Sequence, residues 1–130
     1  MKPKRTENRA RGDLGERAAA RYLRRRLYRI LERNWFYFHK EVDIIARRGS
    51  SLVICEVKTR SHDEYSPYGP ASCAVDSHKQ HNLLVAASAY AASIHWEKSI
   101  RMDVMEVYLT KKRGRLRISE IVHIKNAFTA

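Results

Sequence analysis

The sequence contains little cysteine, proline or glycine, and it has no long apolar run. Its 130 residues include two Cys, three Pro and five Gly. Cys55 and Cys73 form no C-x-x-C pattern and no disulfide framework, which favours a reducing compartment. The longest mostly apolar run, residues 83–94, is too short to span a bilayer. The basic N-terminus also lacks the apolar segment of a signal peptide, so we expect a cytoplasmic protein with no membrane partner.

Negative charge is also scarce. The chain has 14 Asp and Glu against 26 Lys and Arg, which gives a formal net charge of +12. Such an excess in a small chain predicts a polyanionic partner, most often nucleic acid. We therefore expect DNA as the partner. A ribosome-associated or RNA-binding protein and a membrane-surface binder are the alternatives that composition leaves open.

Apolar periodicity predicts one α/β domain. Helices are expected over residues 13–27, where Asp13 can cap the first turn, and over residues 77–93. Five segments have strand patterns: residues 30–38, 42–47, 52–59, 100–109 and 116–124. The order α-β-β-β-α-β-β predicts a mixed sheet flanked by helices. Residues 1–12 are expected to form a flexible basic arm before a domain over 13–130, and residues 61–76 a loop.

The stretch EVDIIARRGSSLVICEVKTR, residues 41–60, places charges inside two apolar strands. Charged groups in buried strands are costly unless they are paired or bind a metal. A two-residue turn beginning at Gly49 would pair Arg48 with Ser51. This register gives two opposed pairs on one face of the hairpin: Asp43 with Glu56, and Glu41 with Lys58. The other face is expected to pack against a helix through Val42, Ile44, Val53, Cys55 and Val57.

Two opposed carboxylates repel each other, and a divalent cation between them removes that penalty. Mg²⁺ is usually held by one or two carboxylates, with water and substrate phosphate completing its shell. The hairpin therefore predicts a metal site open to phosphate. The alternative is a solvated polar face on which Glu41 and Lys58 form an ordinary ion pair. Ile45 and Ile54 on that same face, and the basic composition, weigh against this alternative.

The EVD segment, the hairpin and the EVK segment resemble the D-x(n)-[DE]-x-K signature of restriction-endonuclease-like nucleases. Nearly the whole chain resembles the YraN-type family of small bacterial proteins, a nuclease-like group similar to Holliday-junction resolvases. Five segments carry the resemblance in order: GDLGERAAARYL (residues 12–23), EVDIIA, CEVKTR, RMDVMEV (residues 101–107) and HIKNAF (residues 123–128). A Gly common in the family after the first helix is replaced here by Leu27 or Tyr28.

The resemblance implies a restriction-endonuclease-like single domain and an endonuclease that depends on Mg²⁺ or Mn²⁺ and acts on duplex or branched DNA, including recombination intermediates. Asp43 and Glu56 would hold the cation, with the Val57 carbonyl as a further ligand. Glu16 would hold it through water. Lys58 would orient the attacking water and offset charge on the phosphate.

The remaining candidates are mostly basic. Glu41 would be a secondary acidic group, and Lys79 matches a family Lys that would contact phosphate. Further candidates for contacts with nucleic acid are Arg24, Arg25, Arg26, Arg60, Lys111, Lys112 and Arg113. The alternative function is a non-catalytic nucleic-acid-binding protein that keeps the nuclease fold. A junction resolvase would need a two-fold homodimer to cut symmetrically.

Four consecutive aromatic residues, Trp35 to Phe38, lie at the end of the first predicted strand. Aromatic side chains can stack on nucleobases. Strand alternation instead places every second side chain on the same face. We therefore expect half of these residues to belong to the core.

Overall fold

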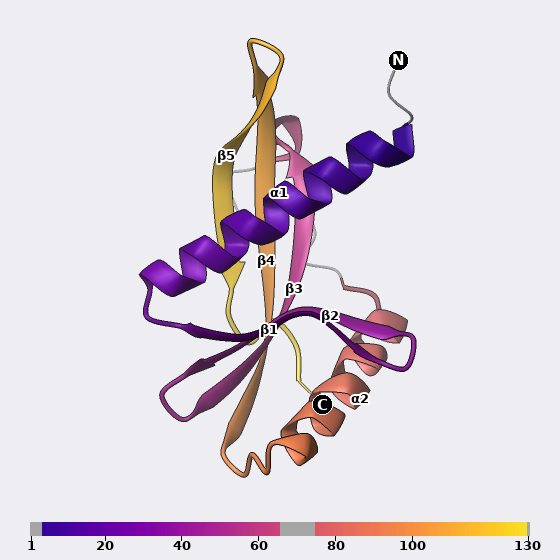
Figure 1. Cartoon of the computed structure of the whole chain (residues 1–130), viewed down its shortest axis with the longest axis vertical. Helices are drawn as coiled ribbons and strands as arrows, with labels where there is room; N and C mark the ends of the chain where they lie inside the picture. Colours follow the sequence, from indigo (N-terminus) through magenta and orange to yellow (C-terminus); the bar gives the residue numbers. More distant parts are fainter. Residues whose placement is uncertain (1–3, 66–74, 130) are drawn as a thin grey trace.

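The computed structural model describes residues 4–65 and 75–129 (Figure 1). Its elements in chain order are α1 (Lys4–Arg25), β1 (Arg29–Tyr37), β2 (Lys40–Arg48), β3 (Ser51–Ser61), the 3₁₀ helix η1 (His62–Glu64), α2 (Ser77–Ser93), β4 (Ser99–Lys112) and β5 (Arg115–Ile124). The predicted α/β class and the order α-β-β-β-α-β-β are confirmed. Residues 66–74 of the expected loop, with Cys73, lie outside the described residues. No helix in the described ranges is long and apolar enough to cross a membrane.

The five strands form one mixed sheet in the order β1-β2-β3-β4-β5. Neighbouring strands are antiparallel except β3 and β4, which run parallel over eleven pairs from Ser51 with Ser99 to Ser61 with Leu109. Parallel neighbours need a crossover connection, and the segment containing α2 supplies it. In Figure 1 the β1–β2 ribbon runs across the direction of β4 and β5. The sheet therefore bends sharply between its two halves.

Helix α1 begins at Lys4, so the predicted start at Asp13 is wrong, and residues 4–12 of the expected arm continue the helix. These residues include Arg, Glu and Ala, which favour helix, and no proline. Glu7 lies in the first turn, where a carboxylate favours the helix dipole. Lys111 Nζ on β4 lies 3.2 Å from Glu7 Oε1 and ties this end of α1 to the sheet.

The C-terminus of α1 is closed by Leu27. The Tyr28 N–H donates to Leu23 O at 3.0 Å and the Leu27 N–H donates to Arg24 O at 3.1 Å, the two bonds of a Schellman motif. Leu27 has φ 68°, a conformation that glycine adopts without steric cost, and its side chain is 82% exposed. Leu27 therefore occupies a backbone position that favours Gly.

The helices cover opposite faces of the sheet. On the α1 face, Ala19, Ala20 and Leu23 pack with Ile44, Ala46, Val53, Cys55, Met105, Val107 and Leu109. On the α2 face, Leu83, Ala86 and Tyr90 pack with Val42, Ile45, Ile54, Met102 and Val104. The prediction that Val42 shares a face with Ile44 is wrong, because the alternation of β2 breaks at Asp43. That break marks the position of the candidate site.

Candidate metal and nucleic-acid site

Strands β2 and β3 separate where the predicted acidic residues begin. Their antiparallel pairs run from Arg48 with Ser51 to Ile44 with Cys55, as the Gly49 turn predicts, and the ladder ends there. Asp43 Oδ2 instead accepts a hydrogen bond from the Val57 N–H at 2.8 Å. The predicted pairs of Asp43 with Glu56 and of Glu41 with Lys58 are therefore not ladder pairs. The backbone group freed by the separation is bound by the Asp43 carboxylate.

Carboxylates from three elements converge at this separation. Glu16 of α1, Glu41 and Asp43 of β2, and Glu56 of β3 line a depression of about 400 Å³, and Asp13 and the basic Arg9 of α1 line it as well. The Asn34 Nδ2 group on β1 donates to Glu16 Oε1 at 3.0 Å and lies 3.4 Å from Glu41 Oε2. We call this depression the acidic pocket. The ordinary ion pair between Glu41 and Lys58, which was the alternative reading of the hairpin, is not formed.

Asp43 is the most strongly affected of these acids. Burial, and then the negative charge of Glu56, raise the pKa of Asp43 to about 7, although the hydrogen bond from the Val57 N–H lowers it. Both carboxylates are buried. An acid with such a pKa binds a proton near neutral pH because no nearby cation neutralises it fully. A divalent cation would relieve the same repulsion.

Glu16 reaches the acidic pocket because α1 approaches β3 closely. A Cβ added at Gly15 would collide with Thr59 Oγ1, so only glycine permits this approach. Partial burial, and then the charge of Asp43, raise the pKa of Glu16 to about 7. The position expected to reach a cation through water is therefore placed beside Asp43.

The predicted lysines occupy different places. Lys79 Nζ, in the first turn of α2, lies 3.5 Å from Glu56 Oε2. That oxygen is buried without a hydrogen bond to any described group. Lys58 lies two residues beyond Glu56 on β3 but does not line the pocket, and its side chain is half-buried. Among the described residues, no ion pair or hydrogen bond of the Lys58 side chain is formed.

Arg60 differs from the other basic candidates because its guanidinium is held by acids. Arg60 Nε donates to Glu106 Oε2 at 2.8 Å, and Arg60 Nη1 lies 3.4 Å from Glu64 Oε2. Glu106 is fully buried and also accepts from the Tyr108 hydroxyl at 3.2 Å. The contacts of Arg60 therefore make it a neutralising partner for a buried acid.

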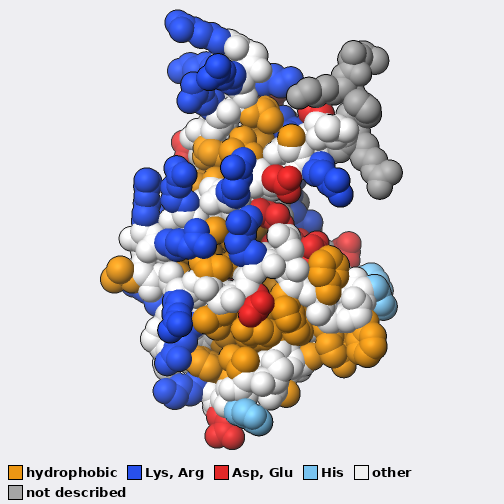
Figure 2. Space-filling view, viewed as in Figure 1, with side chains coloured by type: hydrophobic (Ala, Val, Ile, Leu, Met, Phe, Trp, Pro, Cys, Tyr) orange, Lys and Arg blue, Asp and Glu red, His pale blue; other side chains and the backbone are white. Residues whose placement is uncertain are grey.

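The other basic candidates lie on the surface. Figure 2 shows Lys and Arg side chains spread across the face that carries α1, with acidic side chains grouped among them. Arg24 and Arg25 line a depression with other arginines of α1, and Lys112 and Arg113 lie at the β4–β5 turn. Lys111 is the exception, because it pairs with Glu7. The described surface therefore supplies several cationic patches for a polyanion.

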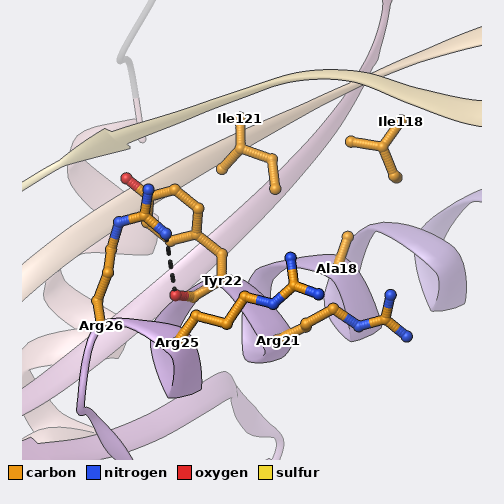
Figure 3. A pocket seen from close by; sticks show the side chains of 7 residues that line it. All are labelled: Ala18, Arg21, Tyr22, Arg25, Arg26, Ile118 and Ile121. Atoms are coloured by element: carbon orange, nitrogen blue, oxygen red, sulfur yellow. Dashed lines mark hydrogen bonds between the residues drawn. The ribbon is translucent and has the colours of Figure 1, made fainter.

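Arg25 and Arg26 also border a groove between α1 and β5 (Figure 3). The Arg26 guanidinium lies over the Tyr22 ring, 3.5 Å from its centroid, and Arg26 Nη1 donates to the Tyr22 carbonyl at 3.3 Å. Ile118 and Ile121 of β5 form the apolar side of the groove. In Figure 3 the Arg21 and Arg25 side chains extend along its rim, so the groove combines apolar and cationic walls.

Another buried acid, Asp103 on β4, was not among the predicted site residues. Its Oδ1 accepts from Arg101 Nε and from the Asn126 N–H, each at 2.9 Å. Its Oδ2 lies 2.9 Å from Arg101 Nη2 and 2.6 Å from His123 Nε2. Burial alone would raise the pKa of Asp103, but the hydrogen bonds from His123 and Arg101 offset it, and the pKa is lowered. Asp103 therefore joins β4, β5 and the C-terminal segment.

The acidic pocket fits a hard divalent cation only in part. No group of three or more His, Cys, Asp and Glu side chains within residues 4–65 and 75–129 has an arrangement that could already hold a metal ion. Its oxygen donors are those that Mg²⁺ and Mn²⁺ prefer, and Mg²⁺ needs only one or two carboxylates besides water and phosphate. Glu56 Oε2, which is buried beside Lys79 but accepts no hydrogen bond from a described group, is such a donor.

Several residues that line the pocket were not predicted from the sequence: Arg9, Gly12, Asp13, Asn34 and Thr59. Asn34 joins Glu16 to Glu41 and has φ 50°, a left-handed conformation that Asn tolerates better than most residues. An Asn in the middle of a predicted strand, directly before a run of aromatic residues, was the available signal. Thr59 faces Gly15, and only the packing of α1 on β3 reveals that contact.

Comparison with known proteins places the chain in one group. The model of the uncharacterised protein family UPF0102 matches residues 15–107. A UPF0102 protein of Caldanaerobacter subterraneus subsp. tengcongensis is 39% identical over 118 residues, which cover 90% of this chain and 93% of that protein. UPF0102 proteins of Acetivibrio thermocellus and Geobacter metallireducens are 39% and 38% identical over 122 residues, with at least 92% of each chain covered. The YraN-type resemblance is thereby confirmed.

Proposed function

Because the chain belongs to the uncharacterised protein family UPF0102, whose name assigns no activity, we propose a function from its own site. We infer that the protein is an endonuclease that hydrolyses DNA phosphodiester bonds with the help of Mg²⁺ or Mn²⁺. The convergence of Glu16, Glu41, Asp43 and Glu56 in one depression supports this proposal. In a chain of net charge +12, a cluster of acids facing a polyanion is unfavourable unless cations bind there.

Asp43 and Glu56 are the residues that would hold the cation, with the Val57 carbonyl as a further ligand and Glu16 acting through water. The bound cation would polarise a phosphoryl oxygen and lower the pKa of a coordinated water. Lys58, a compact positive charge two residues beyond Glu56 on β3, would stabilise the charge that develops on the phosphate.

Other residues would hold the pocket in shape. Asn34 fixes the two outer acids, Glu16 and Glu41, through its amide. Lys79 holds Glu56 at ion-pair distance until a cation or phosphate competes for one of them. The cationic side chains of α1 and of the β4–β5 turn would contact phosphates away from the cut, which favours duplex or branched DNA over mononucleotides.

A second candidate function is nucleic-acid binding without cleavage. The observation that favours it is the position of Lys58, which does not line the acidic pocket. In that case the acids would be a structural cluster, and the basic surface alone would bind DNA.

The test is a cleavage assay with purified protein on linear duplex, single-stranded, flap and four-way-junction DNA. Each substrate is incubated with Mg²⁺, with Mn²⁺ and with EDTA. We expect cleavage with either cation and none in EDTA. Asp43→Asn and Glu56→Gln should abolish cleavage, whereas Lys58→Ala should slow it while DNA affinity is kept.

Glu97→Gln is the matched control, because Glu97 is exposed between α2 and β4 and far from the acidic pocket in the chain. Cleavage that persists in EDTA or in Asp43→Asn contradicts the metal-dependent mechanism. Tight DNA binding without cleavage of any substrate by the wild type selects the second candidate function.

A further inference from the structure

The aromatic run at the end of β1 divides between core and solvent. Trp35 and Tyr37 stack with centroids 6.4 Å apart, and Trp35 contacts the Tyr90 ring of α2 edge-on at 5.1 Å. Phe36 and Phe38 are 57% and 81% exposed. Alternation predicted that half of these residues belong to the core, and the other half are two phenyl rings left in solvent.

Phe38 is held in an unfavourable backbone conformation. It is the first residue of the two-residue turn between β1 and β2, which the pair Tyr37 with Lys40 closes. Its φ of 55° is a value that turns of this kind normally obtain with Gly, Asn or Asp. The ring meets Tyr37 edge-on with centroids 4.7 Å apart. A bulky side chain in this region is strained, and such strain is often found at functional sites.

Phe36 is paired with a residue of the acidic pocket. It is directly opposite Glu41 in the β1–β2 ladder, and opposed residues share a face of the ribbon. Glu41 lines the pocket and is bound by Asn34, which precedes Phe36 by two residues. In Figure 1 the turn between β1 and β2 forms one end of this ribbon, and the turn between β2 and β3 forms the other. Phe38 lies in the first of these turns, two residues along the chain from Phe36.

Positive charge lies close to these rings along the chain, although Glu41 stands opposite Phe36 in the ladder. Arg33 is exposed on β1 and Lys40 is the first residue of β2. Exposed aromatic rings with nearby positive charge form the usual binding surface for single strands, in which bases stack on the rings and cations contact the backbone. A protein partner with an apolar patch would not need the positive charges.

We propose that Phe36 and Phe38 form a stacking platform for unpaired nucleobases next to the acidic pocket. The inference rests on the proposed function, which places a phosphate of the bound DNA strand in the pocket. The bases next to that phosphate would then lie on the two rings. Bases within a duplex are already stacked, so the platform favours strands with unpaired bases, such as flaps, junction branches and single strands. It would therefore determine which DNA structure is cut.

The experiment measures binding without cleavage. Wild type, Phe36→Leu, Phe38→Leu and the double variant are titrated in EDTA with a single-stranded oligonucleotide containing 2-aminopurine and with a blunt duplex. Leucine keeps the apolar volume but has no π face. Loss of stacking on one base weakens binding by about fivefold to a hundredfold. We expect a loss in this range for the double variant on the single strand, and less than about a twofold change on the duplex.

The wild type should also quench or shift 2-aminopurine fluorescence, and the double variant should not. The matched control is Leu27→Ala, because Leu27 is a similarly exposed apolar residue at the far end of α1. This control should bind both probes as the wild type does. Circular dichroism shows whether each variant is folded.

Several results would overturn the platform. These are equal losses on duplex and single strand, unchanged binding by the double variant, and failure of the wild type to bind the single strand. A change of sedimentation coefficient in Phe38→Leu would instead identify the rings as a contact between two copies of the chain. If only the proposed function fails, no substrate is cleaved, but the double variant still loses binding to the single strand selectively.

Discussion

Asp43 and Asp103 are both buried aspartates on central strands, yet their surroundings differ in sign. Asp103 accepts hydrogen bonds from Arg101, His123 and the Asn126 N–H, and its pKa is lowered. Asp43 accepts one bond from the Val57 N–H, faces Glu56, and has its pKa raised to about 7. The chain thus neutralises Asp103 with its own donors and leaves Asp43 among other negative charges.

Asp103 is therefore a structural anchor, whereas Asp43 belongs to the candidate site. Each oxygen of Asp103 has two partners, so the carboxylate is saturated by groups of β4, β5 and the C-terminal segment. The acidic pocket has fewer donors: among the described residues, Lys79 lies at ion-pair distance from Glu56, and Arg9 is the basic residue in the pocket lining. A pocket in which acids outnumber bases gains from binding a cation.

The largest effect is expected for Asp103→Asn. The side-chain amide of the variant would place N–H groups against donors and leave Arg101 without its anion. Breaking such a buried pair costs about 3–5 kcal/mol of unfolding free energy. Guanidinium denaturation measures this loss. Asp63→Asn, at an exposed position of η1, is the control and should change stability by less than about 0.5 kcal/mol. A loss below about 1 kcal/mol in Asp103→Asn would mean that the network is not an anchor.

The next effect concerns the close approach that brings Glu16 to Asp43. Gly15→Ala should destabilise the protein by about 1–3 kcal/mol, because the new methyl group collides with Thr59 and moves α1 away from β3. Gly12→Ala is the matched control on the same helix, since a Cβ there meets nothing within 4 Å. It should stabilise the helix by about 0.5–1 kcal/mol. Equal effects of the two substitutions would contradict the packing argument.

A smaller gain is expected for Asp43→Asn at pH 8 without divalent cations. The amide oxygen can still accept from the Val57 N–H, while the repulsion with Glu56 disappears, so stability should rise by about 1–2 kcal/mol. Thermal unfolding in EDTA measures the gain. Addition of Mn²⁺ should raise the melting temperature of the wild type and leave the variant unchanged. Destabilisation by Asp43→Asn would show that the acid is satisfied as it stands.

The two aspartates also predict opposite pH windows. The pKa of Asp43 is raised above its unfolded value, so the folded state binds the extra proton and stability falls as pH rises from about 4 to about 7. The pKa of Asp103 is lowered, so its contribution is present above about pH 4 and is lost as pH falls further. The slope for one proton is at most about 1.4 kcal/mol per pH unit.

Chemical denaturation in EDTA from pH 3 to pH 8 separates these windows. Asp43→Asn should weaken the decline between about pH 4 and pH 7 and leave the acid limb intact, and Glu16 accounts for any decline that remains. Identical pH profiles for the wild type and Asp43→Asn would contradict the raised pKa.

Much of this arrangement follows from local patterns. The Gly49 turn fixed the register of β2 and β3 as far as Ile44 and Cys55, because a two-residue loop leaves one choice of partners. Helix α2 has the predicted bounds, since its cap Asp76 and its apolar face are both visible in the sequence. The acids Glu16, Glu41, Asp43 and Glu56 were all predicted and do meet in one pocket.

The rest depends on tertiary contacts that local patterns do not contain. The early start of α1 is supported by Lys111 on a distant strand. The β2–β3 ladder ends at Ile44 and Cys55, and Val42 changes face although its alternation looks regular. The network around Asp103 joins residues from four parts of the chain, and the segments RMDVMEV and HIKNAF that contain most of them do not by themselves show that they meet.

The hydrogen bond from the Val57 N–H to Asp43 Oδ2 makes the Val57 amide a probe of the charge on the Asp43 carboxylate. An amide proton that points at a carboxylate changes its NMR chemical shift when that carboxylate gains a proton or a metal ion. The Val57 cross-peak of a ¹⁵N-labelled sample would therefore follow the charge of Asp43 in the absence of DNA. Titration with acid, and then with Mg²⁺ alone, would measure the proton affinity and the cation affinity of the same carboxylate.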